Sequence, residues 1–220
     1  MSSDGNTLWR IKTWFPDLDE ASAVKLKKYH SELLRYNVKL NLIGRQTERD
    51  ADEQHFSDCL LASRLVLSKL DPAHKLICDL GSGNGLPGVV LAILAESIRP
   101  TLKVRLIDSD ERKCEFLKSV VVTLGLKQAE VVCMRIEEIK EPFSAAITRG
   151  LASISKVCLS CKNIIAPGGL VFHLKGSNWF REVGEMPSQL ASFWAPELSG
   201  EYSLPVSQAK RAIVATRKLK

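Results

Sequence analysis

Glycine residues recur closely in one segment of the chain, residues 79–88, which reads DLGSGNGLPG. The segment follows the apolar run KLIC and precedes the apolar run VVLAILA, so a strand, a turn and a helix are expected in that order. Gly81, Gly83 and Gly85 permit a tight turn and let a ligand approach the backbone without obstruction by a Cβ atom. The spacing therefore predicts a ligand-binding loop at the carboxyl end of a strand.

Two kinds of ligand fit such a loop. Residues Gly83 to Gly88 match the pattern G-x-G-x-x-G, which predicts a dinucleotide. Asp79 ends the strand and is expected to face the ligand, where its carboxylate would repel a pyrophosphate and attract a cation. Pro87 removes a backbone N–H from the helix N-terminus, where pyrophosphates are normally bound. S-adenosylmethionine carries an ammonium group and a sulfonium but no phosphate, so it suits both observations.

Acidic residues follow the next two predicted strands. Asp108 ends the strand VRLID, and its carboxylate can accept hydrogen bonds from both hydroxyls of a ribose, which either ligand contains. The strand AEVVCM leads into Ile136, which can pack on an adenine ring, and Glu137, which can accept a hydrogen bond from the exocyclic amine. Glu137 and Glu138 also suit the solvated first turn of a helix, so both interpretations remain open.

Short apolar segments and helical stretches alternate through the rest of the chain. The segments read KLICDL, VRLID, AEVVCM, SAAIT and LVFHLKG, and helical stretches at residues 87–97, 111–124 and 153–165 lie between them. This order predicts βαβ units in an α/β fold, with a mostly parallel sheet covered by helices on both faces. YSLPV and AIVATRK predict two more strands, paired antiparallel at one edge of a seven-stranded sheet.

The first third of the chain has a helical pattern. Apolar residues recur at spacings of three and four, at Leu26, Tyr29, Leu33, Tyr36 and Leu40. A second helix is predicted over residues 48–69, ending before Asp71-Pro72. We therefore expect a helical extension over residues 1–72 and one compact Rossmann-like unit over residues 73–220.

The chain is basic, and its excess charge is uneven. Lys and Arg number 31 against 25 Asp and Glu, a formal charge of +6. Residues 151–220 carry 9 basic and 4 acidic side chains, whereas residues 76–150 carry 10 of each. A basic patch is typical of a polyanion partner, although a solvated, lysine-rich end would give the same count. The basic residues nearest the end are Lys210, Arg211, Arg217, Lys218 and Lys220.

Cysteine usage and the lack of long apolar runs indicate a cytosolic, soluble protein. Only Cys158 and Cys161 have the spacing C-x-x-C, and no second pair completes a zinc site, so no metal is expected. Cys78 and Cys133 lie in apolar strands, which predicts buried free thiols in a reducing compartment. No apolar run approaches the roughly 20 residues of a membrane span, and the N-terminus has no secretory signal.

Several segments, taken together and in this order, resemble the RsmG (GidB) family of bacterial ribosomal RNA methyltransferases. They read YNVKLNL at residues 36–42, HFSD at 55–58, DLGSGNGLPG at 79–88, LID at 106–108, RIE at 135–137, TRG at 148–150, PGG at 167–169 and KG at 175–176. The glycines alone indicate only a methyltransferase-like fold, whereas the extension to GLPG with the two upstream segments is much more specific.

The resemblance implies a Rossmann-like, S-adenosylmethionine-dependent methyltransferase that modifies N7 of a guanine in 16S ribosomal RNA. Guanine N7 has an in-plane lone pair and no proton, so it can attack the methyl group in line without a general base. We therefore assign no catalytic residue. The implied partner is 16S ribosomal RNA or the small ribosomal subunit, and we expect a cytoplasmic monomer without a metal or a membrane.

The resemblance also implies which residues contact the cofactor. These are Gly81, Leu86, Ile136, Glu137 and Arg149, to which the residue pattern itself adds Gly83 and Asp108. The chain departs from the family pattern at Cys59, at Thr148 and Gly150 on either side of Arg149, and at Ile43-Gly44. These departures concern contacts with the substrate rather than the reaction.

Five polar residues are candidates for contact with RNA, namely Asn41, His55, Lys175, Lys210 and Arg211. Each also has an ordinary structural explanation. Asn41 can cap or bridge helices, His55 can be an interior histidine, and Lys175 can be a surface charge after a strand.

Two other functions remain open at this point. The first is an NAD(P)-dependent oxidoreductase, for which G-x-G-x-x-G at residues 83–88 is the only support. The second is a non-catalytic RNA-binding module that has kept the methyltransferase fold.

Overall fold

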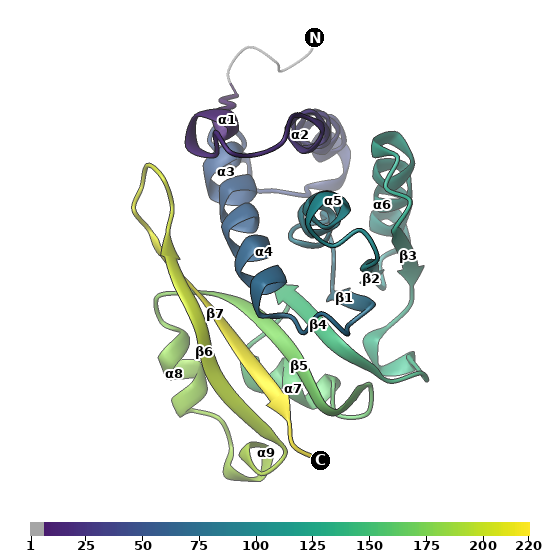
Figure 1. Cartoon of the computed structure of the whole chain (residues 1–220), viewed down its shortest axis with the longest axis vertical. Helices are drawn as coiled ribbons and strands as arrows, with labels where there is room; N and C mark the ends of the chain where they lie inside the picture. The colour runs from purple at the N-terminus through teal and green to yellow at the C-terminus, as the bar shows by residue number, and fades with distance from the viewer. Residues whose placement is uncertain (1–6) are drawn as a thin grey trace.

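A seven-stranded sheet runs through the computed structural model, which describes residues 7–220 (Figure 1). The strands are β1 (Leu76–Leu80), β2 (Lys103–Asp108), β3 (Ala129–Cys133), β4 (Phe143–Arg149), β5 (Ile165–Gly176), β6 (Trp194–Ser203) and β7 (Lys210–Lys218). Their order across the sheet is β3-β2-β1-β4-β5-β7-β6. Strands β1 to β5 pair parallel, and β7 is antiparallel to both β5 and the edge strand β6. The predicted α/β sheet, with an antiparallel pair at one edge, is confirmed.

Helices cover both faces of the sheet. They are α1 (Ile11–Trp14), α2 (Glu20–Leu40), α3 (Arg45–Glu48), the π-helical turn η1 (Asp52–Ser57), α4 (Asp58–Lys69), α5 (Gly88–Ile98), α6 (Glu111–Leu124), the 3₁₀ turn η2 (Ile136–Glu138), α7 (Ile154–Ser160), α8 (Trp179–Gly184) and α9 (Ser188–Ala191). In Figure 1, α4, α5 and α6 lie on one face with α2 outside them, and α7, α8 and α9 lie on the other. In the described part of the chain, no helix combines the length and the apolar character that crossing a membrane requires.

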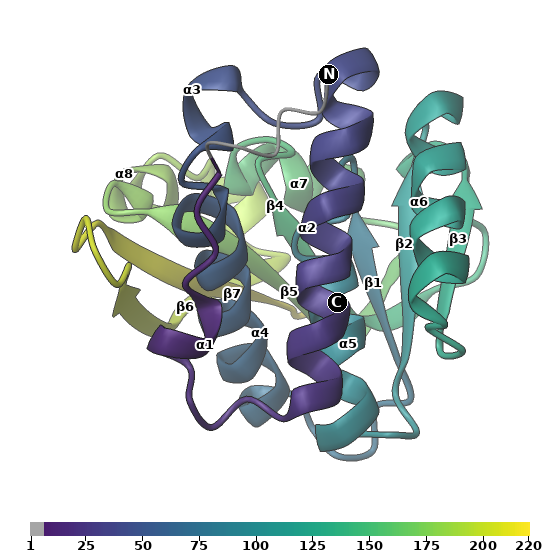
Figure 2. The ribbon, with the colours of Figure 1, turned by 90° about the horizontal axis from the view of Figure 1, so that it is seen from above.

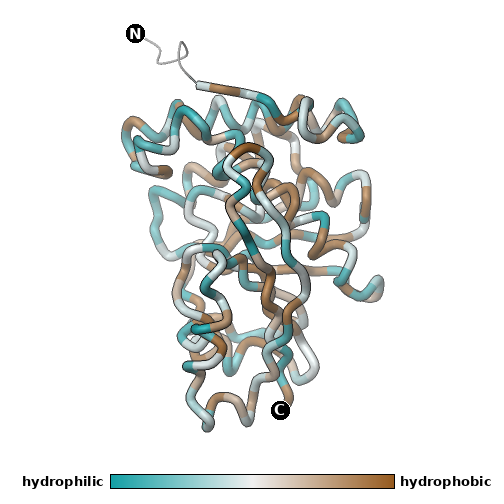
Figure 3. Tube along the Cα trace, turned by 90° about the vertical axis from the view of Figure 1, so that its left-hand side faces the viewer, coloured by the Kyte–Doolittle hydropathy of each residue, from teal (hydrophilic) through white to brown (hydrophobic). Residues whose placement is uncertain are grey.

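The N-terminal helices share a hydrophobic core with the sheet. Leu26, Tyr29 and Leu33 are fully buried and belong to the same buried cluster as Val90 of α5 and Phe116 of α6. Hydrophobic and hydrophilic residues alternate along the helical layer at the top of Figure 3, as expected for a helix with one face on a core. The division of the chain after residue 72 stays a prediction.

The two ends of α6 were predicted from the sequence to the residue. Asp110 caps its N-terminus by accepting hydrogen bonds from the backbone N–H groups of Arg112 and Lys113. Gly125 ends it with a φ of 64°. The helix predicted over residues 48–69 is instead divided into a π-helical turn and α4.

One prediction about cysteine burial is wrong. Five of the six thiols are buried and reduced, but Cys133 is exposed. The reason is topological, because β3 is an edge strand and its residues are only partly covered.

Candidate functional site

A ligand-sized cavity of about 510 Å³ opens at the carboxyl ends of β1, β2 and β3. It brings together most of the residues predicted to contact a cofactor. Its lining comprises Gly81, Gly83, Ile107, Asp108, Ser109, Lys113, Met134, Arg135, Ile136, Glu137, Gly150, Leu151, Ala152, Lys156, Val157, Ser160 and Cys161. Gly81, Gly83, Asp108, Ile136 and Glu137 are thus side by side, although three separate strand ends supply them.

The glycine loop has a conformation that side chains would prevent. Gly81 has a φ of +67°, and a Cβ atom there would lie 2.6 Å from Cδ1 of Leu151. Gly85 has a φ of +87°, and its Cβ would lie 2.7 Å from Oη of Tyr29. Both positions therefore require glycine, for the turn at the first and for close helix packing at the second.

Asp108 links the loop to the cavity. One carboxylate oxygen accepts a hydrogen bond of 2.7 Å from the backbone N–H of Gly83, and the other accepts one of 2.9 Å from that of Asp110. An ionised carboxylate has about four acceptor positions, so two remain for ligand hydroxyls. The side chain is consequently held in place and can still bind a ribose.

The prediction that Asp79 faces the ligand is wrong. Its side chain is buried beneath the loop, with 1% of its surface exposed, and does not line the cavity. Oδ2 accepts a hydrogen bond from the backbone N–H of Gly88, while Oδ1 has no partner among the described residues. Burial raises the pKa of this carboxyl group to about 7. Asp79 therefore supports the start of α5 rather than attracting a ligand.

The N-terminal helices hold the glycine loop from behind. The hydroxyl of Tyr29 donates to the carbonyl of Asn84, at 2.5 Å, and the side-chain amide of Asn84 donates to the carbonyl of Leu42, at 3.0 Å. The sequence identified Tyr29 only as one member of an apolar stripe, and helical spacing contains no signal for this contact.

A second, smaller cavity of about 210 Å³ lies beside the first. It is lined by Asp58, Arg149, Leu174, Lys175, Gly176 and Arg211. Arg149 and Gly150 are consecutive residues that line the two cavities in turn. The Nζ atom of Lys175 donates to the carbonyl of Ala152, which lines the first cavity. The two cavities therefore adjoin at the end of β4.

Three basic side chains and one carboxylate line the smaller cavity. Asp58 forms ion pairs with Arg149, at 3.3 Å, and with Arg211, at 3.7 Å. It also accepts a hydrogen bond of 2.8 Å from the hydroxyl of Tyr202. Lys175 donates to Glu182 at the rim. The cavity lining keeps an excess of positive charge, which suits a phosphate or an electron-rich base edge.

His55 is neutral and bonded at both ring nitrogens. Arg149 donates to Nδ1 at 2.8 Å, and Nε2 lies 2.9 Å from Oγ1 of Thr47. Thr47 donates its own proton to the carbonyl of Gly44, which assigns the histidine proton to Nε2. Burial, with a further contribution from Arg149, lowers the pKa of His55 to about 3. His55 is therefore an uncharged hydrogen-bond acceptor that orients the Arg149 guanidinium group.

Four other predicted site residues, Leu86, Arg149, Asn41 and Lys210, do not line the larger cavity. Leu86 is 4% exposed and packs in the core beneath the loop. Arg149 does not line the larger cavity, and Asn41 is exposed at the end of α2 with a φ of 49°. Lys210 is exposed and donates to the hydroxyl of Ser203.

The basic residues near the end of the chain do not form one patch, which corrects the interpretation of their charge as a single basic patch for a polyanion. Arg211 pairs with Gly176 at the carboxyl end of β5, whereas Arg217 pairs with Leu170 near the other end. The Nζ atom of Lys218 is turned inward and donates to the carbonyls of Lys162 and Ile165. Of these residues only Arg211 lines one of the two cavities, and Lys210 is its neighbour on β7.

No cluster of three or more potential metal ligands occurs within residues 7–220.

The chain matches the family described as rRNA small subunit methyltransferase G over residues 22–199. It is 42% identical over 212 residues to "Ribosomal RNA small subunit methyltransferase G 3" of Bdellovibrio bacteriovorus, covering 96% of this chain and 94% of the relative. It is 33% identical over 208 residues to the methyltransferase G of Desulfotalea psychrophila, covering 91% and 92%.

The fold is also shared with more distant enzymes. A SAM-dependent O-methyltransferase from Thermotoga maritima superposes with a TM-score of 0.53 at 18% identity, over 73% of this chain and 65% of that one. At this identity the likeness shows the Rossmann-like fold alone. The closer sequence matches identify the family, and the chain belongs to the rRNA small subunit methyltransferase G family.

Proposed function

We propose that this chain transfers a methyl group from S-adenosylmethionine to N7 of a guanine in 16S ribosomal RNA. One observation carries the proposal. A cavity with acceptors for a nucleoside adjoins a second cavity with excess positive charge, and the consecutive residues Arg149 and Gly150 line the two in turn. The family supports the coarser activity, methylation of ribosomal RNA.

The residues of the larger cavity fit the cofactor. Asp108 has free acceptor positions for ribose hydroxyls, Ile136 can cover an adenine ring, and Glu137 can accept from its amine. When bound there, S-adenosylmethionine supplies an electrophilic methyl group. The absence of a side chain at Gly81 lets Leu151, which also lines the cavity, pack directly against the loop.

The smaller cavity suits a reaction without a general base. His55 is bonded at both nitrogens, and the Asp58 carboxylate is bound by two guanidinium groups and by Tyr202. These residues position charge rather than accept a proton. Guanine N7 needs only alignment with the methyl group, and alignment alone can contribute roughly 7–11 kcal/mol to lowering a barrier.

Calorimetric titration separates this proposal from the oxidoreductase. S-adenosylhomocysteine is expected to bind the pure protein and NADH is not. NADH is a fair competitor, because Lys113, Arg135 and Lys156 also line the cavity and could contact a pyrophosphate. Binding of NADH alone would overturn the proposal.

Transfer of a labelled methyl group to RNA separates the proposal from a non-catalytic module. Purified protein is incubated with tritiated cofactor and with either naked 16S RNA or small ribosomal subunits. The position is mapped by borohydride and aniline cleavage of RNA from cells with and without the protein. We expect one cleavage at a guanine that depends on the protein. No transfer to either substrate would favour the module.

We expect a monomer in the cytoplasm, which sedimentation and cell fractionation would test.

A further inference from the structure

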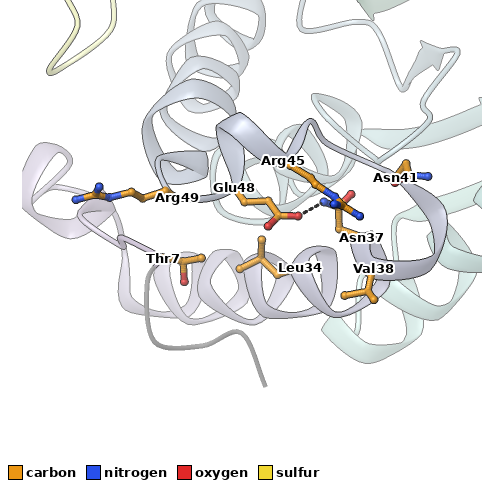
Figure 4. Close-up of a pocket in the computed structure, with 8 residues that line it drawn as sticks. All are labelled: Thr7, Leu34, Asn37, Val38, Asn41, Arg45, Glu48 and Arg49. Atoms are coloured by element: carbon orange, nitrogen blue, oxygen red, sulfur yellow. Dashed lines mark hydrogen bonds between the residues drawn. The ribbon is translucent and has the colours of Figure 1, made fainter. Parts of the chain in front are cut away.

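A groove of about 410 Å³ separates α2 from α3 and shares no lining residue with the two cavities at the sheet edge. Figure 4 shows its lining residues, which are Thr7, Leu34, Asn37, Val38, Asn41, Arg45, Glu48 and Arg49. None of them has a role in the function proposed above, and only Asn41 was a candidate RNA contact from the sequence.

Asn37 gives the groove a fixed shape. Its side-chain carbonyl accepts from the backbone N–H of Ile43, at 2.8 Å, and its amide donates to the carbonyl of the same residue, at 3.1 Å. The amide also donates to Oε1 of Glu48, at 2.5 Å. Because Asn37 is buried, these bonds fasten the connection after α2 and aim the Glu48 carboxylate into the groove before any ligand arrives.

Two arginines flank that carboxylate. Arg45 and Arg49 are exposed, and Figure 4 shows their side chains on either side of Glu48. Neither forms an ion pair or a side-chain hydrogen bond within residues 7–220. Other arginines do, as at Arg64 with Asp17 and at Arg105 with Glu130. Separated in this way, the two guanidinium groups suit successive phosphates of a strand better than one small anion.

The remaining lining suits a nucleoside. Glu48 would repel a bare anion, but it can accept a hydrogen bond from a base amine or a ribose hydroxyl. Val38 is 79% exposed and, with Leu34, provides an apolar wall. Phosphates, hydrogen-bond donors and an apolar face occur together in single-stranded RNA.

The groove lies on the side of the molecule where the substrate must enter. In Figure 2 the arrowheads of β1 to β4 point toward the side on which α3 lies. Thr47, between the groove residues on α3, bonds to His55, which in turn accepts from Arg149. Thr47 is thus linked through His55 to Arg149 of the smaller cavity, while Arg45 and Glu48 of the same short helix line the groove.

We propose that this groove binds a single-stranded segment of the substrate RNA, apart from the guanine that is methylated. Arg45 and Arg49 contact phosphates, and Glu48 accepts a hydrogen bond from a base or ribose. The identity of the RNA rests on the proposed function, but the binding does not.

The test measures binding of a short, fluorescein-labelled single-stranded RNA by anisotropy over a range of salt concentrations. The double variant Arg45→Gln/Arg49→Gln is expected to lower the slope of log affinity against log salt by about 1.4, because each phosphate contact contributes about 0.7 for single strands. The control Lys127→Gln/Lys140→Gln removes the same charge from exposed positions that lie just before the amino ends of β3 and β4, away from the carboxyl ends where the cavities open. The control is expected to keep the wild-type slope.

The variant Glu48→Gln provides a second test, because removal of a negative charge would by itself strengthen the binding of RNA. The variant keeps an acceptor for Asn37 and makes the groove more positive, yet binding is expected to weaken roughly threefold because a charged acceptor is removed. Tighter binding of this variant, or equal slopes for the arginine variant and the control, would overturn the proposal. If the wild type transfers no methyl groups but the arginine variant still lowers the salt slope, the proposed methylation would be overturned and RNA binding in the groove would stand.

Discussion

The hydroxyl of Tyr29 on α2 donates a hydrogen bond of 2.5 Å to the backbone carbonyl of Asn84, in the middle of the glycine loop. A helix from the first third of the chain therefore fixes the loop that forms one wall of the larger cavity, where we propose that the cofactor binds. The helices before β1 therefore support the larger cavity through this contact, although none of their residues lines it.

Replacing Tyr29 with phenylalanine should weaken both the fold and cofactor binding. The change leaves the Asn84 carbonyl without its partner and is expected to lower the free energy of unfolding by about 1–2 kcal/mol. Urea denaturation and calorimetric titration with S-adenosylhomocysteine measure the two effects. Tyr36→Phe is the control, since that hydroxyl lies 3.3 Å from Oγ of Ser119 on α6, away from the loop. Equal cofactor affinity in both variants would contradict the role of Tyr29.

Asp79 should make the protein less stable as pH rises toward neutrality. Its pKa is raised to about 7 in the folded protein by burial, against 3.8 for the ordinary side chain. Between these pH values the folded state holds a proton that the unfolded state releases. The stability contributed by protonated Asp79 is therefore fully present below about pH 4 and is lost by about pH 7. Urea denaturation across this range should show a smaller decline in Asp79→Asn than in the wild type. Parallel pH profiles would show that the group is ionised in the fold.

Arg149 should act on the substrate side of the site. In Arg149→Gln, methyl transfer is expected to fall roughly a hundredfold through poorer positioning of the substrate, while the affinity for S-adenosylhomocysteine changes less than about threefold. The reason is that Arg149 lies with Asp58 and Arg211 in the smaller cavity. Arg105→Gln is the control, because Arg105 pairs with Glu130 on the neighbouring strand. A parallel loss of cofactor affinity would instead support the cofactor contact that the family resemblance implies.

The basic residues on and just after β7 should divide into three groups. Lys210→Gln/Arg211→Gln is expected to lower the salt dependence of RNA binding, by about 0.7 for each phosphate that the variant no longer neutralises. Arg217→Gln/Lys220→Gln, at the other end of the strand, should leave it unchanged. Lys218→Gln should mainly reduce stability, since its Nζ atom satisfies two carbonyls and only 9% of its surface is exposed. An equal effect of the two double variants on the salt slope would mean that the whole strand contacts RNA.

Features with a local cause were predictable from the sequence. The ends of α6 follow from an aspartate cap and a left-handed glycine, both of which act within one helical turn. The glycine loop and Asp108 were also predictable, because each follows a recognisable strand and parallel strands bring their carboxyl ends to the same edge of the sheet.

Features that depend on distant partners were not predictable. Lys210 and Lys218 are eight positions apart in the sequence, but an extended strand of that length separates them by roughly 25 Å. Asp79 lies in a strand buried on both faces, so alternation of side chains could not show which way it points. The cluster around Asp58 joins α4, β4 and β6, which no spacing in the sequence relates.

The exposure of Cys133 provides a reporter that needs no mutation. It is the single accessible thiol among the six, and the residues that follow it, Met134 to Glu137, line the larger cavity. A thiol-reactive fluorophore would therefore attach at one position, next to the wall that is proposed to cover the adenine. Its emission would follow ligand occupancy in real time in the otherwise unmodified protein.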